Sequence, residues 1–253
     1  KGIDIKMVKD NYKKNKRNKK NFVVICFLIF LLIFLMAGLI FLFLPLCPEL
    51  NDSSLQIIKE DKPIQVPAIN LVKIPQKYLL FNKEIYLNNE TLTNMVSLFE
   101  EAKKYEINLV LVYGYRSNEQ QKELYDEEVQ KWIKNGKTIK EAENISKTIV
   151  ALPGESEHQL GTTIDITEEH ENNEYYLSEN AKNWLEEEAW KFGFILSYPK
   201  NKTYLTDIIY EPWHWRYIGK KYAAELYQSN YLSSTNNITI RSYLQEKRHN
   251  AIN

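Results

Sequence analysis

Two short stretches contain residue types that bind metal ions and transfer protons. SEHQLGTTID places His158 seven residues ahead of Asp165, and EPWHWRYIG places Glu211 three residues ahead of His214. Two imidazoles and a carboxylate suit zinc, and a catalytic zinc takes three protein ligands while its fourth position holds water. The ion lowers the pKa of that water to about 7. Glu211, not needed as a ligand, has the right chemistry to accept the water's proton and hand it to a leaving amine.

These residues also have a purely structural interpretation. A histidine in an aromatic segment is commonly a core residue, and an aspartate on a strand is commonly a surface residue. The two spacings are weak signals when taken singly, but together, with a glycine between the first histidine and the aspartate, they become specific. Trp213 and Trp215 flank His214, and we expect their large rings to fix the neighbouring rotamers by packing. Arg216 fits a structural role, such as pairing with an acidic group, better than a catalytic one.

A third stretch, YGYRSNEQQ, lies upstream of the other two. With it, the sequence resembles the VanY-type zinc D-alanyl-D-alanine carboxypeptidases, peptidase family M15B. The family pattern reads SGYRS, S-x-H-x-x-G-x-A-x-D and E-P-W-H-W-R-Y-x-G, and all three motifs are present here in that order. The resemblance covers about Tyr78 to Tyr231. It implies a single α+β zinc peptidase domain of the hedgehog/DD-peptidase type, a small antiparallel sheet with helices.

The resemblance also implies a metal site and its base. One Zn²⁺ per chain would be held by His158, Asp165 and His214, and Glu211 would be the general base.

On the substrate side, Arg116 would steady the scissile carbonyl or bind the substrate's carboxylate, which a guanidinium can hold through two hydrogen bonds. An ordinary surface ion pair is the alternative for this arginine. Gln121 and Ser156 match positions that line the family's substrate pocket. Two residues depart from the pattern: Tyr113 and Thr163 stand where small residues are usual, and both could narrow the pocket.

The implied reaction removes the C-terminal D-alanine from peptidoglycan stem pentapeptides. An L,D-carboxypeptidase that shortens tetrapeptide stems to tripeptides shares the motifs and is the nearest alternative. A D,D-dipeptidase fits less well with a domain outside the cytoplasm. A non-catalytic zinc-fold binding or signalling module is a third alternative, but the intact base and ligands favour an enzyme. A plain structural protein without metal would leave three ordered motifs unexplained. We expect the domain to be monomeric.

Charge is unevenly distributed along this chain of 253 residues, although its formal net charge is zero. Residues 1–21 contain nine Lys and Arg against two Asp, a net of +7. Residues 22–46 then contain no charged side chain, and about 18 apolar residues suffice to cross a bilayer. The run is too long for a signal peptide and no A-x-A cleavage site follows; LPLC before Cys47 fits a lipoprotein signal poorly.

We therefore expect a single-pass anchor in a bacterial cytoplasmic membrane, with the basic tail inside by the positive-inside rule and the domain outside. The basic run 13–20 reflects this topology rather than nucleic-acid binding. Residues 47–77 read as a polar stalk, 78–231 as the peptidase domain and 232–253 as an extension that either closes the domain or hangs loose. With Cys26 in the span and Cys47 at its edge, the domain contains no cysteine, so its zinc site cannot use thiolates.

The elements that must position the motifs alternate without a strict βαβ rhythm, which favours an α+β domain. Hydrophobic spacing and capping residues predict five helices. They lie over 91–105 with Thr91 as N-cap, after GYRS as far as Gly136, from Thr138 with a capping box to about Val150, from Ser178 to Gly193, and over 220–227. Short apolar runs predict strands over 108–113, 162–166 and 194–198, with one more leading into EPWHW.

Overall fold

The computed structural model describes residues 70–169, 176–233 and 235–252. All of these residues belong to one compact unit. The predicted basic tail, the predicted span over 22–46 and most of the predicted stalk lie outside the described residues. Within the described ranges, no helix has the length and apolar character needed to cross a membrane.

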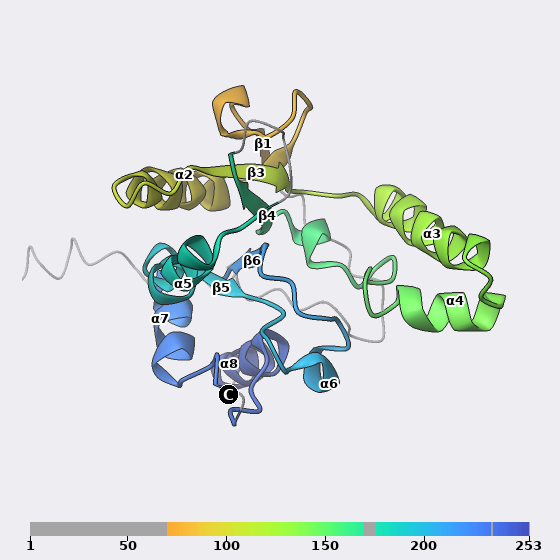
Figure 1. Ribbon diagram of the computed structural model, residues 1–253. Coiled ribbons are helices and arrows are strands. Elements are labelled where there is room, and N and C mark those ends of the chain that lie inside the picture. Colours follow the sequence, from red (N-terminus) through yellow and green to blue (C-terminus); the bar gives the residue numbers. More distant parts are fainter. Residues whose placement is uncertain (1–69, 170–175, 234, 253) are drawn as a thin grey trace, which may run out of the picture. The chain divides into compact units, whose positions relative to one another are not determined.

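A four-stranded antiparallel sheet forms the centre of this unit (Figure 1). Its strands, in spatial order, are β3 (Leu109–Tyr113), β4 (Thr163–Glu168), β6 (His214–Tyr217) and β5 (Phe194–Leu196). A separate antiparallel pair consists of β1 (Leu71–Lys73) and β2 (Tyr86–Asn88). The small antiparallel sheet with helices confirms the predicted α+β class. Because β1 and Ile74 of the core precede Tyr78, the folded unit extends upstream of the predicted boundary.

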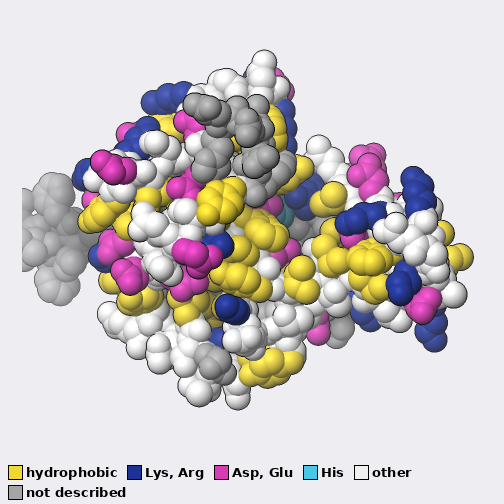
Figure 2. All heavy atoms as spheres, in the orientation of Figure 1, with side chains coloured by type: hydrophobic (Ala, Val, Ile, Leu, Met, Phe, Trp, Pro, Cys, Tyr) yellow, Lys and Arg dark blue, Asp and Glu magenta, His cyan; other side chains and the backbone are white. Residues whose placement is uncertain are grey.

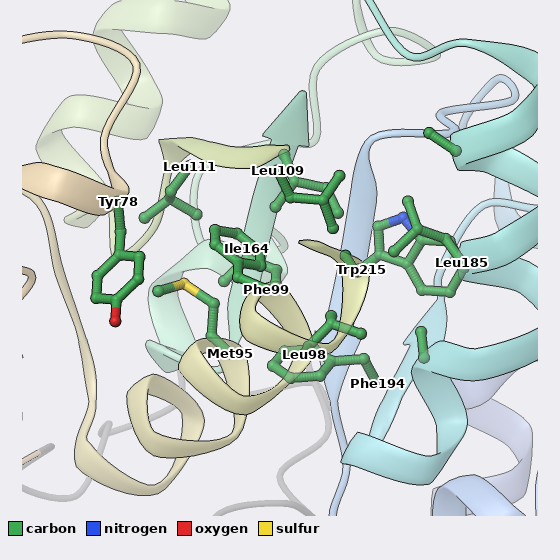
Figure 3. Packing of buried hydrophobic residues seen from close by; sticks show 14 of the residues in the cluster. Tyr78, Met95, Leu98, Phe99, Leu109, Leu111, Ile164, Leu185, Phe194 and Trp215 are labelled. Atoms are coloured by element: carbon green, nitrogen blue, oxygen red, sulfur yellow. The ribbon is translucent and has the colours of Figure 1, made fainter. Parts of the chain in front are cut away.

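Side chains alternate between the two faces of the sheet, as they must in any strand. In β4, Ile164 and Ile166 belong to the main hydrophobic cluster, whereas Asp165 between them belongs to the opposite face. The helix α2 (Asn89–Lys103) covers the apolar face, and Figure 3 shows its Met95 and Phe99 among the core side chains of the strands. One face of the sheet therefore builds the core, and the other is left for chemistry.

Three of the remaining helices begin at a side-chain N-cap: Ser117, Thr138 and Ser178. In chain order, the remaining helices are α3 (Asn118–Lys134), α4 (Ile139–Ser146), α5 (Glu179–Glu188), α6 (Thr203–Thr206), α7 (Lys220–Gln228) and α8 (Ile240–Ile252), with 3₁₀ turns η2 (Gln76–Tyr78), η3 (Glu157–Leu160) and η4 (Ala189–Phe192). The capping boxes at Ser117 and Thr138 are both formed. Gly193, in the left-handed conformation (φ 88°), ends η4, so the predicted helix up to it is an α-helix followed by a 3₁₀ turn.

Three local predictions were wrong. The N-cap of α2 is Asn88, whose side chain accepts from the Glu90 N–H, while Thr91 is buried inside the helix. The helix α4 stops at Ser146 instead of continuing to Val150. Residues 208–210 form no strand; β6 lies within the EPWHW motif itself, because α6 and a left-handed turn at Asp207 occupy the preceding segment.

The C-terminal extension closes the domain. From α8, Ile240, Tyr243 and Leu244 are buried in a second hydrophobic cluster together with Ala223 and Leu226 of α7. The buried ammonium of Lys202 also donates to the carbonyl oxygens of Tyr231 and Ile238 in the segment leading to α8. The sequence left open whether this extension packs on the domain or hangs loose, and the structure shows that it packs.

Candidate active site

Strand register brings the first two site residues together. Asp165 of β4 pairs directly with His214 of β6. On its other side, Asp165 pairs with Tyr113, because the register between β3 and β4 shifts between Leu111 and Tyr113. Such an irregularity bends a strand locally and re-aims its side chains. Three neighbouring strands thus present Tyr113, Asp165 and His214 at one place.

The third candidate ligand, His158, comes from η3. The Ser156 hydroxyl begins this turn by accepting from the His158 N–H, and Gly161 ends it in the left-handed conformation with φ 66°. That conformation costs a glycine little, since it has no Cβ. The reversed chain then enters β4, which returns Asp165 to the side of His158.

Ligand atoms of His158, Asp165 and His214 all lie within 4.8 Å of one another. His158 Nε2 is 3.2 Å from Asp165 Oδ2, and His214 Nδ1 is 3.2 Å from Asp165 Oδ1. Glu211 Oε2 lies 3.4 Å from the same His214 Nδ1. The structure therefore gathers the three predicted ligands and the predicted base at one point.

The outward hydrogen bonds of the two rings determine which nitrogens face that point. His158 Nδ1 lies 2.7 Å from the Gly114 carbonyl oxygen, which can only accept, so this nitrogen carries the proton. His214 Nε2 lies 3.1 Å from Glu157 Oε2 and donates to that carboxylate. His158 Nε2 and His214 Nδ1 are thereby left facing carboxylate oxygens. Acceptors that converge in this way need a cation between them, and the His₂Asp donor set fits Zn²⁺.

Glu157 also belongs to the site, although none of the sequence motifs indicated it. Its side chain accepts from Arg216 Nη1 at 2.9 Å, from Ser197 Oγ at 2.5 Å and from His214 Nε2. The contact confirms that Arg216 pairs with an acidic group. The sequence does contain a weak signal for this pair: Glu157 directly precedes His158, and Arg216 follows His214 by two residues.

Burial and neighbouring charges together shift the pKa values of His214 and Glu211. Burial opposes a proton on His214, but its hydrogen bonds to Asp165 and Glu157 outweigh burial and raise the His214 pKa to about 10. Burial raises the Glu211 pKa to about 8, with the Asp165 and Glu157 charges adding to the shift. In the protein without metal, a proton on His214 therefore compensates the surrounding carboxylates. A divalent cation would compensate them more completely.

The pKa values of two other carboxylates in the site, Glu157 and Asp165, are lowered instead. Burial disfavours the charge of Glu157, but Arg216 and His214 outweigh it and hold the Glu157 pKa below its usual range. Burial likewise opposes the charge of Asp165, but the two histidines hold the Asp165 pKa below its usual range. Both carboxylates are therefore ionised and act as acceptors at neutral pH.

All seven predicted site residues line one cavity of about 160 Å³. Within it, Arg116 Nη1 donates to Gln121 Oε1 at 2.7 Å, and Gln121 Nε2 donates to the Ala151 carbonyl oxygen at 2.7 Å. Gln121 therefore holds the guanidinium in place. Ser156 is buried in the wall, where it also caps η3. Figure 2 shows hydrophobic side chains bordering the recess between the α3–α4 hairpin and the sheet.

Of Trp213, Trp215, Tyr113 and Thr163, only Trp213 and Tyr113 line the cavity. Trp215 is buried in the core and its Nε1 donates to the Pro212 carbonyl oxygen, as expected of a packing residue. Trp213 is 41% exposed and lines the cavity instead, so its predicted packing role was wrong. Tyr113 lines the cavity and can narrow it. Thr163 is fully buried and absent from the cavity wall, so it cannot.

Comparison with protein families places this site in a known context. A family model described as "VanY: D-alanyl-D-alanine carboxypeptidase" matches residues 84–220. The putative carboxypeptidase YodJ of Bacillus subtilis is 38% identical over 179 residues, covering 68% of this chain and 60% of that protein. A D-alanyl-D-alanine carboxypeptidase of Enterococcus faecalis is 39% identical over 133 residues, covering 51% and 47%. The chain thus spans between about half and three fifths of the length of these relatives.

Solved structures of carboxypeptidases are similar to this chain as well. A vancomycin resistance D,D-pentapeptidase VanY from a VanB-type resistance cassette, in complex with Zn(II), is similar with a TM-score of 0.63 at 29% identity. The match covers 76% of this chain and 99% of that one. The LD-carboxypeptidase LdcB is similar with a TM-score of 0.58 at 34% identity, covering 73% of this chain and 80% of that one.

Proposed function

Since the chain belongs to the VanY family of D-alanyl-D-alanine carboxypeptidases, we propose that it is a zinc D,D-carboxypeptidase. Its substrate would be the peptidoglycan stem pentapeptide, from which it removes the C-terminal D-alanine. The observation that carries the proposal is the convergence of His158, Asp165 and His214 within 4.8 Å, with Glu211 beside them. The Zn(II) complex of the similar VanY structure supports the choice of metal.

The residues divide the chemistry among themselves. His158 Nε2, His214 Nδ1 and an Asp165 oxygen would hold one zinc ion, which supplies Lewis-acid activation of water and of the scissile carbonyl. Glu211 accepts the proton of the attacking water and passes it to the departing amine nitrogen. Burial raises the Glu211 pKa, so this carboxylate takes up the proton of the water more readily than an exposed glutamate would.

Arg116 supplies the positive charge for the rest of the substrate. Its guanidinium either stabilises the oxyanion that forms at the scissile carbonyl or binds the free carboxylate of the terminal residue. Gln121 keeps it oriented by accepting one N–H. A cavity of about 160 Å³ suits a small terminal residue such as alanine better than a long side chain.

An L,D-carboxypeptidase activity on tetrapeptide stems is the second candidate. Its support is the likeness to LdcB at 34% identity over 80% of that chain. The two activities differ in the residue before the scissile bond and share the metal chemistry. A non-catalytic module is disfavoured, because such a protein has no need of a buried carboxylate 3.4 Å from a metal-facing nitrogen.

Location outside a cytoplasmic membrane remains a prediction from residues 1–46. It suits the proposed substrate, a polymer of the cell wall.

Mass spectrometry of peptide products tests the proposal directly. The zinc-loaded chain and its Glu211→Gln variant are each incubated with stem pentapeptide and with stem tetrapeptide. Loss of one D-alanine from the pentapeptide alone is expected, with turnover at least about 100-fold lower in the variant. Shortening of the tetrapeptide instead would transfer the assignment to the L,D class. One equivalent of bound zinc without any cleavage would refute both enzymes in favour of the non-catalytic module.

A further inference from the structure

A second cavity adjoins the catalytic one and has no role in the chemistry described above. Its volume is about 350 Å³, within the range of small-molecule binding sites, whereas the catalytic cavity holds about 160 Å³. The two cavities share three wall residues, Tyr113, Asp165 and Trp213. The two cavities therefore lie side by side, with Asp165 at their common boundary.

The direction of the substrate follows from the position of Arg116. This cation lines only the smaller cavity, so that cavity suits the carboxyl-terminal residue of a peptide. The chain on the N-terminal side of the scissile bond must then leave in another direction. The larger cavity shares three wall residues with the catalytic cavity, so we take it as the direction in which the rest of the peptide leaves.

The walls of the larger cavity define the chemistry of its occupant. Val112, Ile166 and Leu177 make its sides apolar, and Tyr113 and Trp213, each about 40% exposed, form an aromatic rim. Such walls favour an aliphatic chain. The cavity also contains one cationic side chain, that of Lys182 from α5.

Lys182 has a partner that a ligand can replace. Its ammonium lies 2.7 Å from Glu179 Oε1, in a pair one helical turn apart, and the Glu179 side chain is 82% exposed. Exposed pairs of this kind contribute little stability. A ligand carboxylate held by the cavity walls can therefore take the place of Glu179 at small cost.

We propose that the cavity lined by Val112, Ile166, Leu177 and Lys182 binds the substrate residue that precedes the D-alanyl-D-alanine end, and that it selects a long aliphatic side chain ending in a carboxylate. Lys182 forms the ion pair with that carboxylate, and the apolar walls contact its methylene groups. The inference rests on the proposed function in one respect: the peptide's carboxyl terminus must occupy the catalytic cavity.

Three synthetic peptides of the form acetyl-X-D-Ala-D-Ala test the charge preference. X is 2-aminopimelate with a side-chain carboxylate, norleucine without charge, or lysine with an amine. The full chain is compared with Lys182→Glu, which inverts the charge in the cavity. Lys191→Glu is the matched control, because Lys191 forms the same kind of one-turn pair with Glu188 and lines neither cavity. Peptide affinities are measured in the Glu211→Gln background, and kcat/KM is measured with Glu211 intact.

The chain should favour the 2-aminopimelate peptide over the lysine peptide, and Lys182→Glu should lower that ratio at least tenfold in both affinity and kcat/KM. Lys191→Glu should leave the ratio unchanged, and the norleucine peptide should respond to neither variant. Equal ratios in the chain and in Lys182→Glu would overturn the proposal. Charge-dependent binding without cleavage by the intact chain would uphold the cavity assignment and refute the carboxypeptidase.

Discussion

At the scale of single residues, His214 is the most constrained group of the site. One ring nitrogen faces Asp165 and Glu211, and the other donates to Glu157. When one ring nitrogen of an imidazole binds a metal, an acceptor at the other nitrogen fixes the ring's orientation and tautomer and increases its basicity. Glu157 is itself held by Arg216 and Ser197. The metal-facing geometry of His214 thus depends on a residue that never touches the metal.

Glu157→Gln should therefore weaken zinc binding without removing a ligand. Loss of the carboxylate leaves His214 with a weaker acceptor, and removal of such an outer partner costs about 10- to 100-fold in metal affinity. Competition with a chromophoric chelator measures the zinc dissociation constant. Glu155→Gln, two residues upstream in the same segment, should keep wild-type affinity. Equal affinity of both variants would mean that zinc binding does not depend on the Glu157 carboxylate.

That the seven candidate residues lie together was predictable from sequence because their motifs have fixed spacing, and all seven line one cavity. Glu157 was not predictable in the same way. It is adjacent to His158 in a 3₁₀ turn, and both side chains contact or face His214. Neighbouring residues in a helical turn usually point in different directions, so no sequence period indicates this convergence.

At the scale of elements, the segment after β3 positions His158 through its backbone. Gly114 follows the strand, and its carbonyl oxygen accepts from His158 Nδ1. A Cβ at this position would lie 2.7 Å from the Tyr86 carbonyl oxygen and 2.8 Å from Ile85 Cγ2. Both contacts are closer than a real Cβ allows, so β2 and this segment can approach only at a glycine.

Gly114→Ala should reduce both stability and zinc affinity. Overpacking of this kind costs about 1–3 kcal/mol, and the displaced carbonyl group changes the position of His158. Urea unfolding and chelator competition measure the two effects. Gly136→Ala is the control: its left-handed conformation (φ 83°) costs about 1–2 kcal/mol, but nothing lies within 4 Å of the added Cβ, so zinc affinity should be unchanged. Undiminished zinc affinity in Gly114→Ala would contradict this role.

Helices with clear caps were well predicted, whereas elements that depend on distant partners were not. The capping box at Thr138 consists of hydrogen bonds between residues three apart, so the sequence alone indicates it. Strand β1 lies in a segment with several prolines, and α8 follows an Asn-rich one. Their existence depends on pairing with β2 and on burial against α7, which a local pattern does not contain.

Leu244→Ala tests whether α8 contributes to the fold. This side chain is fully buried in the second cluster, and truncating a buried leucine costs about 2–5 kcal/mol. The free energy of unfolding in urea measures the loss. The exposed neighbour Gln245, changed to alanine, should shift that free energy by no more than about 0.5 kcal/mol. A similar small effect for Leu244→Ala would mean that α8 is dispensable.

At the scale of the whole molecule, zinc should couple the site to global stability. The proposed ligands come from η3, β4 and β6, so an ion bound to all three favours the folded chain over the unfolded one. The two sheet strands also supply Ile164, Ile166 and Trp215 to the main core. Loss of the metal should therefore lower the stability of the strands that build the main hydrophobic core.

Chelation should lower the melting temperature by about 5–10 °C relative to zinc at a hundred times its dissociation constant. That excess adds about 2.7 kcal/mol of stability, and each kcal/mol corresponds to about 2–4 °C for a unit of this size. Differential scanning fluorimetry measures the shift. His214→Ala should remove it, and His249→Ala, at an exposed position of α8, should retain it. A zinc-dependent shift that survives His214→Ala would place the ion elsewhere.

The direct pairing of Asp165 with His214 across β4 and β6 also has a practical meaning for preparing the protein. A slip of one residue between these strands would turn Asp165 toward the core and separate it from His214. A slipped molecule would keep almost all of its backbone hydrogen bonds, and its circular dichroism would hardly differ from that of the native protein. It would, however, lack a complete ligand set. Zinc content per mole of purified chain therefore becomes an assay of how faithfully a batch has refolded.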